Sequence, residues 1–128
     1  MKNILVVDDD RIVLMLLKRI LEREGFVAHC VANAEEALEH IRERTFALMI
    51  TDFNMPGMDG LELARKGLEI APLMAVIMDT GGISPKITRL AEEIGISKVL
   101  AKPILVNELL ETVRDVMGTQ REWAAATG

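Results

Sequence analysis

Five short apolar runs alternate with stretches of helical periodicity along this 128-residue chain. The runs are four to six residues long and several, such as "NILVV", are rich in β-branched residues, which is typical of strands buried on both faces. Between the runs, apolar residues recur at i, i+3, i+4 and i+7, the spacing of one face of a helix. The predicted strands cover 3–7, 26–31, 47–51, 73–78 and 98–101.

This alternation predicts a single α/β domain. Strands that alternate with helices pair in parallel, and the helices then cover both faces of the sheet. Because crossovers are right-handed, few other arrangements remain, and the expected fold is a five-stranded, doubly wound (βα)5 sheet. The predicted helices cover 11–23, 34–41, 60–69, 85–94 and a last stretch that includes Leu109, Val113 and Val116 and ends at Gly118.

The end of the chain has a different pattern. The segment "GTQREWAAATG" lacks a periodic apolar face, so we expect a frayed tail over 118–128 after a domain over 1–117. Trp123 lies in this segment, and the pattern leaves open whether it docks on the domain.

Composition narrows the classes of function. The net charge is −5, whereas a surface that binds duplex nucleic acid is usually basic. No apolar run approaches the ~20 residues of a membrane span, and "MKNILVV" meets Asp8 too early for a signal peptide. The one cysteine, Cys30, cannot form an internal disulfide and fits a reducing compartment. We therefore expect a cytoplasmic protein that binds neither membrane nor nucleic acid.

Polar side chains gather where the predicted strands end. The carboxyl ends of parallel strands lie along one edge of a sheet, and ligands bind there, where the strand order reverses. If the first and third strands flank that point, their acids meet and repel each other unless a cation lies between them. The residues are Asp8, Asp9 and Asp10 after the first strand, Asp52 after the third, Thr80 after the fourth and Lys102 after the fifth.

A hard divalent cation would relieve this repulsion. Mg²⁺ prefers six oxygen ligands, typically takes one or two carboxylates and keeps several waters. Asp9 and Asp52 are the expected carboxylate ligands. The backbone carbonyl of Asn54 would complete the protein's share, and Asp8 is expected one layer further out, beside the water ligands.

The same rim suits phosphoryl transfer, which asks mainly for positioning and charge stabilisation. Asp52 is the candidate nucleophile, because a neighbouring metal keeps a carboxylate ionised and neutralises the incoming phosphoryl group. Lys102 would supply a positive charge for a phosphoryl oxygen, and Thr80 a hydroxyl donor.

Each of these residues also has an ordinary structural explanation. An Asp after a strand is commonly a helix N-cap, and we expect Asp10 and Asn33 to cap the first two helices. Thr80 alone is a strand former, and Lys102 alone is a solvated surface charge. The conjunction of suitable groups at four strand ends favours the phosphoryl site.

These segments resemble a known family. "LVVDDD", "DFNMPGMDG", "VIMDTGG" and "VLAKP" are similar to the signature segments of the receiver domain of two-component response regulators, the chemotaxis-type single-domain receiver in particular, and the likeness covers about 2–117. The resemblance implies the flavodoxin-like strand order 2-1-3-4-5. It also implies Asp52 as phosphoacceptor, Asn54 as the backbone ligand of Mg²⁺, and a cis bond between Lys102 and Pro103.

The resemblance further implies a mode of action. Family members take a phosphoryl group from a histidine kinase or a histidine phosphotransfer protein with Mg²⁺ and hydrolyse the acyl phosphate themselves, although they are not enzymes in the usual sense. Phosphorylation shifts an equilibrium between two conformations. Thr80 then moves toward the phosphate, and the surface formed by the fourth helix, fifth strand and fifth helix changes its downstream protein partner. A monomer or a weak dimer is expected.

Two positions depart from the family pattern. Val99 occupies the place of the usual aromatic residue of the fifth strand, so the signal is expected to leave through the Gly81–Gly82 loop and the start of the fourth helix. Asp79 adds an acid beside Thr80, and neither its direction nor its role follows from the pattern.

The first helix has more apolar residues than one stripe needs. Ile12, Leu14, Met15 and Leu21 predict a wide buried face. The alternative is a docking patch for a kinase or phosphotransfer helix.

Two other classes of function compete with the receiver. In a haloacid-dehalogenase-type phosphatase, Asp8 and Asp10 would form the DxD pair, with Thr80 and Lys102 as later motifs. That scheme leaves Asp52 idle and lacks a late acidic pair. A receiver-shaped binding module that takes no phosphate is the other alternative, and the complete set of site residues disfavours it.

Overall fold

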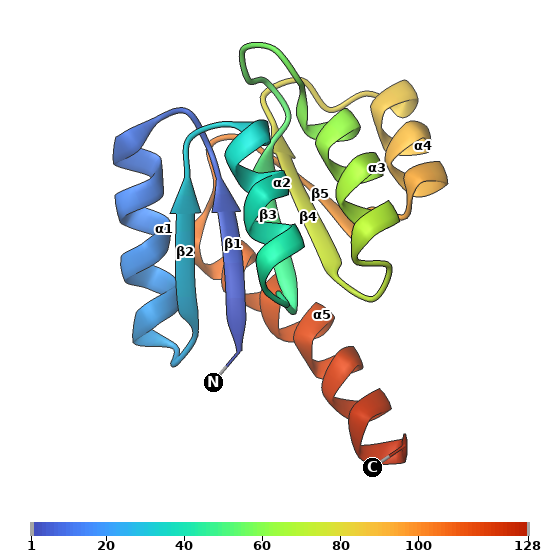
Figure 1. Ribbon diagram of the computed structural model, residues 1–128. Helices are drawn as coiled ribbons and strands as arrows, with labels where there is room; N and C mark the ends of the chain where they lie inside the picture. Colours follow the sequence, from blue (N-terminus) through green and yellow to red (C-terminus); the bar gives the residue numbers. More distant parts are fainter. Residues whose placement is uncertain (1, 128) are drawn as a thin grey trace.

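The computed structural model describes residues 2–127, with side chains described up to Gly118. In this part of the chain, five strands alternate with five helices (Figure 1). Their bounds are β1 Asn3–Val7, α1 Arg11–Arg23, β2 Val27–Val31, α2 Ala34–Glu43, β3 Leu48–Asp52, α3 Gly60–Ile70, β4 Ala75–Thr80, α4 Pro85–Ile94, β5 Lys98–Ala101 and α5 Val106–Thr127.

The strands form one parallel sheet in the order β2-β1-β3-β4-β5. The predicted fold class and strand order are therefore confirmed. After β1 the chain forms β2 on one side of it, at the edge of the sheet, and then forms β3 on its other side. The strand order therefore reverses between β1 and β3. In Figure 1 the carboxyl ends of the strands point to the upper edge, where the loop between β3 and α3 projects.

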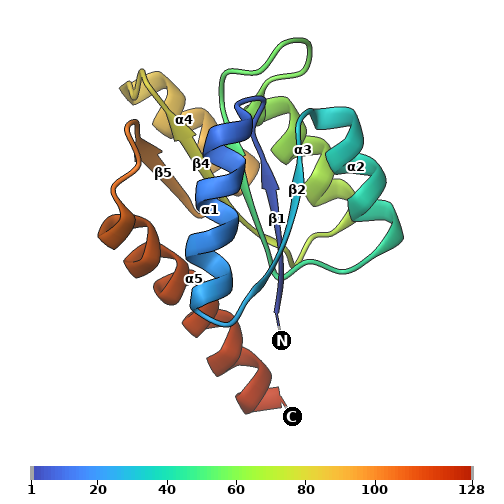
Figure 2. The same ribbon diagram turned by 90° about the vertical axis from the view of Figure 1, so that its left-hand side faces the viewer.

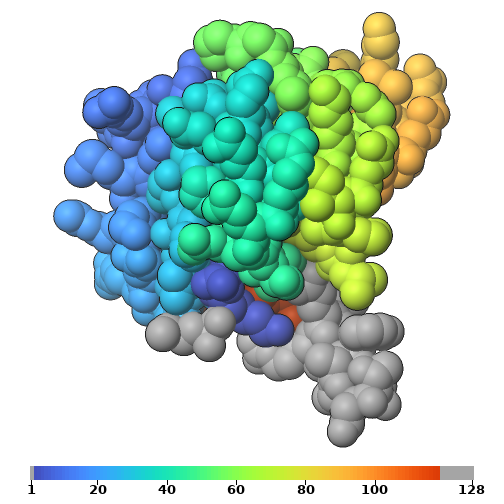
Figure 3. Space-filling model, viewed as in Figure 1, coloured from blue at the N-terminus to red at the C-terminus, as the bar shows by residue number. Residues whose placement is uncertain are grey.

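Helices cover both faces of the sheet. Helices α2, α3 and α4 pack on one face, and α1 and α5 pack on the other (Figures 1 and 2). Figure 3 shows α2 and α3 side by side over the first of these faces. Side chains of β1 alternate between the two, with Leu5 and Val7 toward α2 and α3 and with Ile4 and Val6 toward α1 and α5. Burial on both faces explains why the strands read as continuous apolar runs.

The expected helix caps are present. The Asp10 carboxylate accepts hydrogen bonds from the backbone N–H groups of Ile12 and Val13, and Asn33 and Ser84 cap α2 and α4 in the same manner. Gly95 ends α4 with a φ of 105°, a left-handed conformation that favours glycine.

The fourth strand is displaced from its predicted position. It begins at Ala75 rather than at position 73, because the chain after Pro72 makes a turn in which the Met74 N–H bonds to the Ala71 carbonyl. At its other end the strand continues through Asp79 to Thr80, since these residues still pair with β5.

The predicted end of the last helix at Gly118 was wrong, because α5 continues to Thr127. One glycine costs a helix only ~1 kcal/mol, and the Gln, Arg, Glu and Ala residues that follow are good helix formers. The division into a domain over 1–117 and a tail over 118–128 stays a prediction. Trp123 lies outside the residues whose side chains are described.

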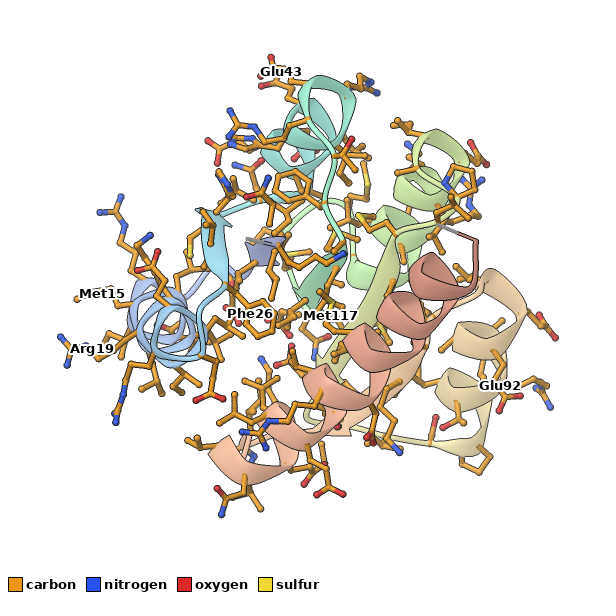
Figure 4. The ribbon with its side chains drawn as sticks, turned by 90° about the horizontal axis from the view of Figure 1, so that it is seen from below. Met15, Arg19, Phe26, Glu43, Glu92 and Met117 are labelled. Atoms are coloured by element: carbon orange, nitrogen blue, oxygen red, sulfur yellow. The ribbon has the colours of Figure 1, made fainter. Side chains whose placement is uncertain are left out.

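The wide buried face predicted for α1 was also wrong. Leu14 and Leu21 are buried, but Ile12 is 76% exposed and Met15 is 69% exposed. Figure 4 shows Met15 pointing away from the body of the protein, whereas Phe26 and Met117 point inward. A helix that lies on one face of a sheet buries only the stripe that meets the sheet. None of the helices within 2–127 is both long and apolar enough to cross a bilayer.

Candidate metal and phosphoryl site

Three carboxylates meet at the carboxyl ends of β1 and β3. Asp8, Asp9 and Asp52 each place one carboxylate oxygen within 4.8 Å of the others. The pairing of Val7 with Thr51 brings the two strand ends together, as the sequence predicted. Asp8 and Asp52 are buried and Asp9 is exposed, so the cluster is open to solvent on one side.

The loop after β1 is held by its own acids. The Asp10 N–H donates to Asp8 Oδ1 at 2.9 Å, and the Asp10 carboxylate is occupied by the N-terminus of α1. Burial raises the pKa of Asp8, and the negative charge of Asp52 raises it further. The hydrogen bond from the Asp10 N–H opposes this rise. Asp10 caps a helix and lies outside the acid cluster, which disfavours it as the second acid of the DxD pair in the phosphatase alternative.

Asp52 has two partners on one oxygen. Its Oδ1 accepts from the Asn54 N–H at 3.2 Å and lies 2.9 Å from the Lys102 Nζ. Asn54 thus lies at the predicted rim, and the role of its carbonyl as a metal ligand stays a prediction.

Lys102 extends from the loop after β5 to the end of β3. Burial lowers the pKa of its ammonium, but the hydrogen bond to Asp52 and the charges of Asp52, Asp79 and Asp8 outweigh that effect and raise it. Lys102 is therefore a stable positive charge at the site. Its bond to Pro103 is cis, as expected.

Asp79 is on the same face of the sheet as Asp52. The two residues pair across β3 and β4, so their side chains project in the same direction. Asp79 is only 2% exposed, its Oδ2 lies 3.9 Å from the Lys102 Nζ, and no described residue donates a hydrogen bond to this oxygen. Burial and the charge of Asp52 raise its pKa to about 7, although Lys102 opposes the shift. The sequence left open which way the Asp79 side chain points, and in the structure it lies on the same side of the sheet as Asp52.

The Thr80 hydroxyl is engaged away from the acid cluster. It accepts a hydrogen bond from the Gly82 N–H at 3.1 Å, and Thr80 itself is buried. Val99, which pairs with Met78, is half-buried against the core under α2, α3 and α4. The structure therefore brings together the predicted residues Asp8, Asp9, Asp52 and Lys102, while the approach of Thr80 to the site stays a prediction.

Gly60 is a site residue that the sequence reasoning did not single out. A Cβ at this position would lie 2.5 Å from the Asp52 carbonyl oxygen and 2.9 Å from the Phe53 Cα. The Gly60 N–H also bonds to the Phe53 carbonyl at 2.9 Å. The first residue of α3 therefore packs directly against the end of β3. The signal was the glycine at the end of "DFNMPGMDG", immediately after the α3 N-cap Asp59.

Residues 4–114 match the family model described as the response regulator receiver domain. The chain belongs to this family. It is a receiver of two-component signalling, a class of domain that accepts a phosphoryl group on an aspartate and binds Mg²⁺ at an acidic pocket. Histidine kinases supply the phosphate to such receivers, which then act on downstream partners.

The chain is similar to proteins of different lengths. It is 33% identical over 129 residues to the sensory/regulatory protein RpfC of Xanthomonas campestris, a match that covers 95% of this chain but only 17% of RpfC. A solved CheY-like receiver domain protein from Methanospirillum hungatei is 34% identical with a TM-score of 0.91, over 95% of this chain and 98% of that one.

A solved response regulator from Burkholderia pseudomallei carries a phosphorylated aspartic acid, a calcium ion and citrate. It is 28% identical to this chain with a TM-score of 0.83, over 100% of this chain and 76% of that one.

The donor set of this chain fits Mg²⁺. The three clustered side chains offer only carboxylate oxygens, the hard ligands that this ion prefers. Oxygens of an octahedral Mg²⁺ site lie roughly 3–4 Å apart when each is ~2.1 Å from the ion, and oxygens within 4.8 Å of one another can reach that spacing with small side-chain rotations.

Proposed function

We propose that Asp52 is the phosphoacceptor and that Asp9, Asp52 and the Asn54 carbonyl hold the Mg²⁺, with Asp8 beside the water ligands. One observation carries the proposal. The buried Asp52 carboxylate belongs to the acid cluster at the strand ends and also has an ammonium beside it, with Lys102 Nζ 2.9 Å from Asp52 Oδ1. The phosphorylated aspartic acid of the similar Burkholderia pseudomallei regulator supports the same chemistry.

The transfer step needs little from the protein beyond alignment and charge. An Asp52 carboxylate oxygen attacks the phosphorus of a phosphohistidine, a P–O bond forms, and the P–N bond breaks with its electrons returning to the imidazole. Lys102 neutralises a phosphoryl oxygen. Bound Mg²⁺ supplies further positive charge for the phosphoryl oxygens. Water then attacks the same phosphorus, the P–O bond to Asp52 breaks, and inorganic phosphate leaves the regenerated carboxylate, which is the dephosphorylation.

The output begins at Thr80. Its hydroxyl turns from the Gly82 N–H toward a phosphoryl oxygen, which frees the Gly81–Gly82 loop at the start of α4. Gly81 and Gly82 are exposed, and a Cβ added to either would meet no atom within 4 Å, so the loop has room to move. The face of α4, β5 and α5 is then the surface that a downstream partner reads, without an aromatic switch at Val99.

The phosphodonor docks on α1. Ile12, Met15 and Leu16 are exposed there, and Leu105 and Val106 are exposed at the start of α5. A groove of about 530 Å³ lies between these elements, lined mainly by apolar side chains, and Lys102 and Asp79 are among its lining residues. An apolar helix of a histidine kinase or phosphotransfer protein placed there would bring its phosphohistidine close to Asp52. The receiver itself is a monomer or a weak dimer in the cytoplasm.

Intact-protein mass after incubation with acetyl phosphate and Mg²⁺ tests the proposal. We expect one added phosphoryl group that requires Mg²⁺ and is lost with Asp52→Asn. No adduct under any condition would instead favour the receiver-shaped binding module. Steady phosphate release from small phosphoesters that survives Asp52→Asn but not Asp8→Asn would favour the phosphatase.

A further inference from the structure

Asp79 is a buried acid that the transfer chemistry does not use. It is 2% exposed, and its Oδ2 has no hydrogen-bond donor among the described residues. The nearest positive charge to this oxygen is the Lys102 ammonium, whose Nζ lies 3.9 Å away. The same Nζ lies 2.9 Å from Asp52 Oδ1. One ammonium thus serves two buried carboxylates on neighbouring strands.

A purely structural role does not explain this arrangement. A buried carboxylate usually stabilises a fold only when hydrogen bonds replace its lost hydration. Asp79 caps no helix, its Oδ2 accepts no hydrogen bond from the described residues, and the oppositely charged group near it is the Lys102 ammonium at 3.9 Å. Retaining it costs folding free energy, which points to a role in the site.

We propose that Asp79 is a positioning residue that restrains phosphorylation of Asp52 by holding back the Lys102 ammonium. This inference rests on the proposed function. To neutralise a phosphoryl oxygen, Lys102 must direct its charge away from Asp79, and the buried carboxylate is then left without a partner. The added negative charge also disfavours an anionic phosphodonor at a site that already holds Asp8, Asp9 and Asp52.

The first test compares rates of phosphorylation. Asp79→Asn keeps the shape of the side chain and removes its charge, and Ile77→Val, two residues earlier on the same face of β4, loosens the same core without changing charge. At about pH 8.5 with saturating Mg²⁺ and acetyl phosphate, we expect Asp79→Asn to be phosphorylated about fivefold faster than the natural chain. An unchanged or slower rate, or an equal gain with Ile77→Val, overturns the proposal.

The second test asks whether the effect passes through Lys102. In a Lys102→Gln background, Asp79→Asn should lose most of its rate gain, because no ammonium remains to be released. A gain of the same size in both backgrounds would mean that Asp79 acts by another route and would overturn the proposal.

The third test needs no phosphate. Urea unfolding of the four proteins of this cycle, with EDTA present, measures the coupling between Asp79 and Lys102 directly. We expect Asp79→Asn to raise the unfolding midpoint, and to raise it more in the Lys102→Gln background. If Asp79 and Lys102 show no coupling in unfolding, the role proposed for Asp79 is overturned, whether or not the natural chain takes phosphate. If the coupling is present but the natural chain takes no phosphate, only the proposed function is overturned.

Discussion

The Lys102 ammonium lies 2.9 Å from Asp52 Oδ1 and so connects the loop after β5 to the end of β3. This contact spans the sheet across β4, whose own strand end carries Asp79 and Thr80. The carboxylate that we assign as acceptor is therefore surrounded by groups from three further strand ends.

Loss of the ammonium should slow phosphorylation. Lys102→Ala removes the charge that neutralises a phosphoryl oxygen, and we expect the rate with acetyl phosphate to fall about 10- to 100-fold, the size of one charge-assisted hydrogen bond. The time course of intact-protein mass measures this rate. Lys102→Arg keeps the charge in a different shape, so its phosphorylation rate should lie between those of the natural chain and Lys102→Ala. Equal rates for the natural chain and both variants would exclude a role for the ammonium.

Mg²⁺ binding should depend on particular acids of the loop after β1. We expect Asp8→Asn and Asp9→Asn each to weaken Mg²⁺ binding by at least about tenfold in titration calorimetry. Asp10→Asn is the matched control, because it removes the same charge from the same loop while Asn still caps α1. An equal loss with Asp10→Asn would show that net charge alone governs the affinity.

The stability of the metal-free protein should fall as pH rises. The pKa of Asp79 is raised from 3.8 to about 7, so the folded state holds this proton more tightly than the unfolded state does. Stability is then lost between about pH 4 and pH 7, as the unfolded chain ionises first. The raised pKa of Asp8 acts in the same direction. Urea unfolding across this pH range in EDTA measures the slope, and Asp79→Asn should flatten it.

Gly60 should tolerate no side chain. In Gly60→Ala the new Cβ would lie 2.5 Å from the Asp52 carbonyl oxygen, so α3 or the end of β3 must shift. We expect a loss of about 1–3 kcal/mol of unfolding free energy together with slower phosphorylation. Gly118→Ala is the control: its Cβ meets no atom within 4 Å, it lies inside α5, and it should stabilise by about 0.5–1 kcal/mol. A loss with Gly118→Ala would argue against the continued helix.

The exposed side of α1 should matter for the protein donor alone. Met15→Glu changes a side chain that is 69% exposed, so stability should change by less than about 0.5 kcal/mol. Phosphorylation by acetyl phosphate should be unaffected, whereas transfer from a purified histidine kinase that phosphorylates the natural chain should slow. Glu92→Lys on α4, which Figure 4 shows pointing outward, is the control and should leave both rates unchanged. Equal effects on both donors would place the docking surface elsewhere.

The sequence by itself determined the order and type of every element and most of the site. Short apolar runs and helical spacing depend on local periodicity, and caps such as Asp10 and Asn33 act within a few residues of the helix that they start. The acids Asp8, Asp9 and Asp52 could be placed together because parallel strands end at one edge.

Only the tertiary structure decided what surrounds those acids. The register of β3 against β4 turns Asp79 toward Lys102, and it leaves the Thr80 hydroxyl bonded to Gly82. The exposure of Met15 depends on which elements cover α1, and the need for glycine at position 60 depends on how closely α3 approaches β3. The contact between Asp79 and Lys102 joins residues far apart in the chain, and even the short-range contacts of Thr80 and Gly60 depend on how strands and helices pack, so sequence periodicity does not predict them.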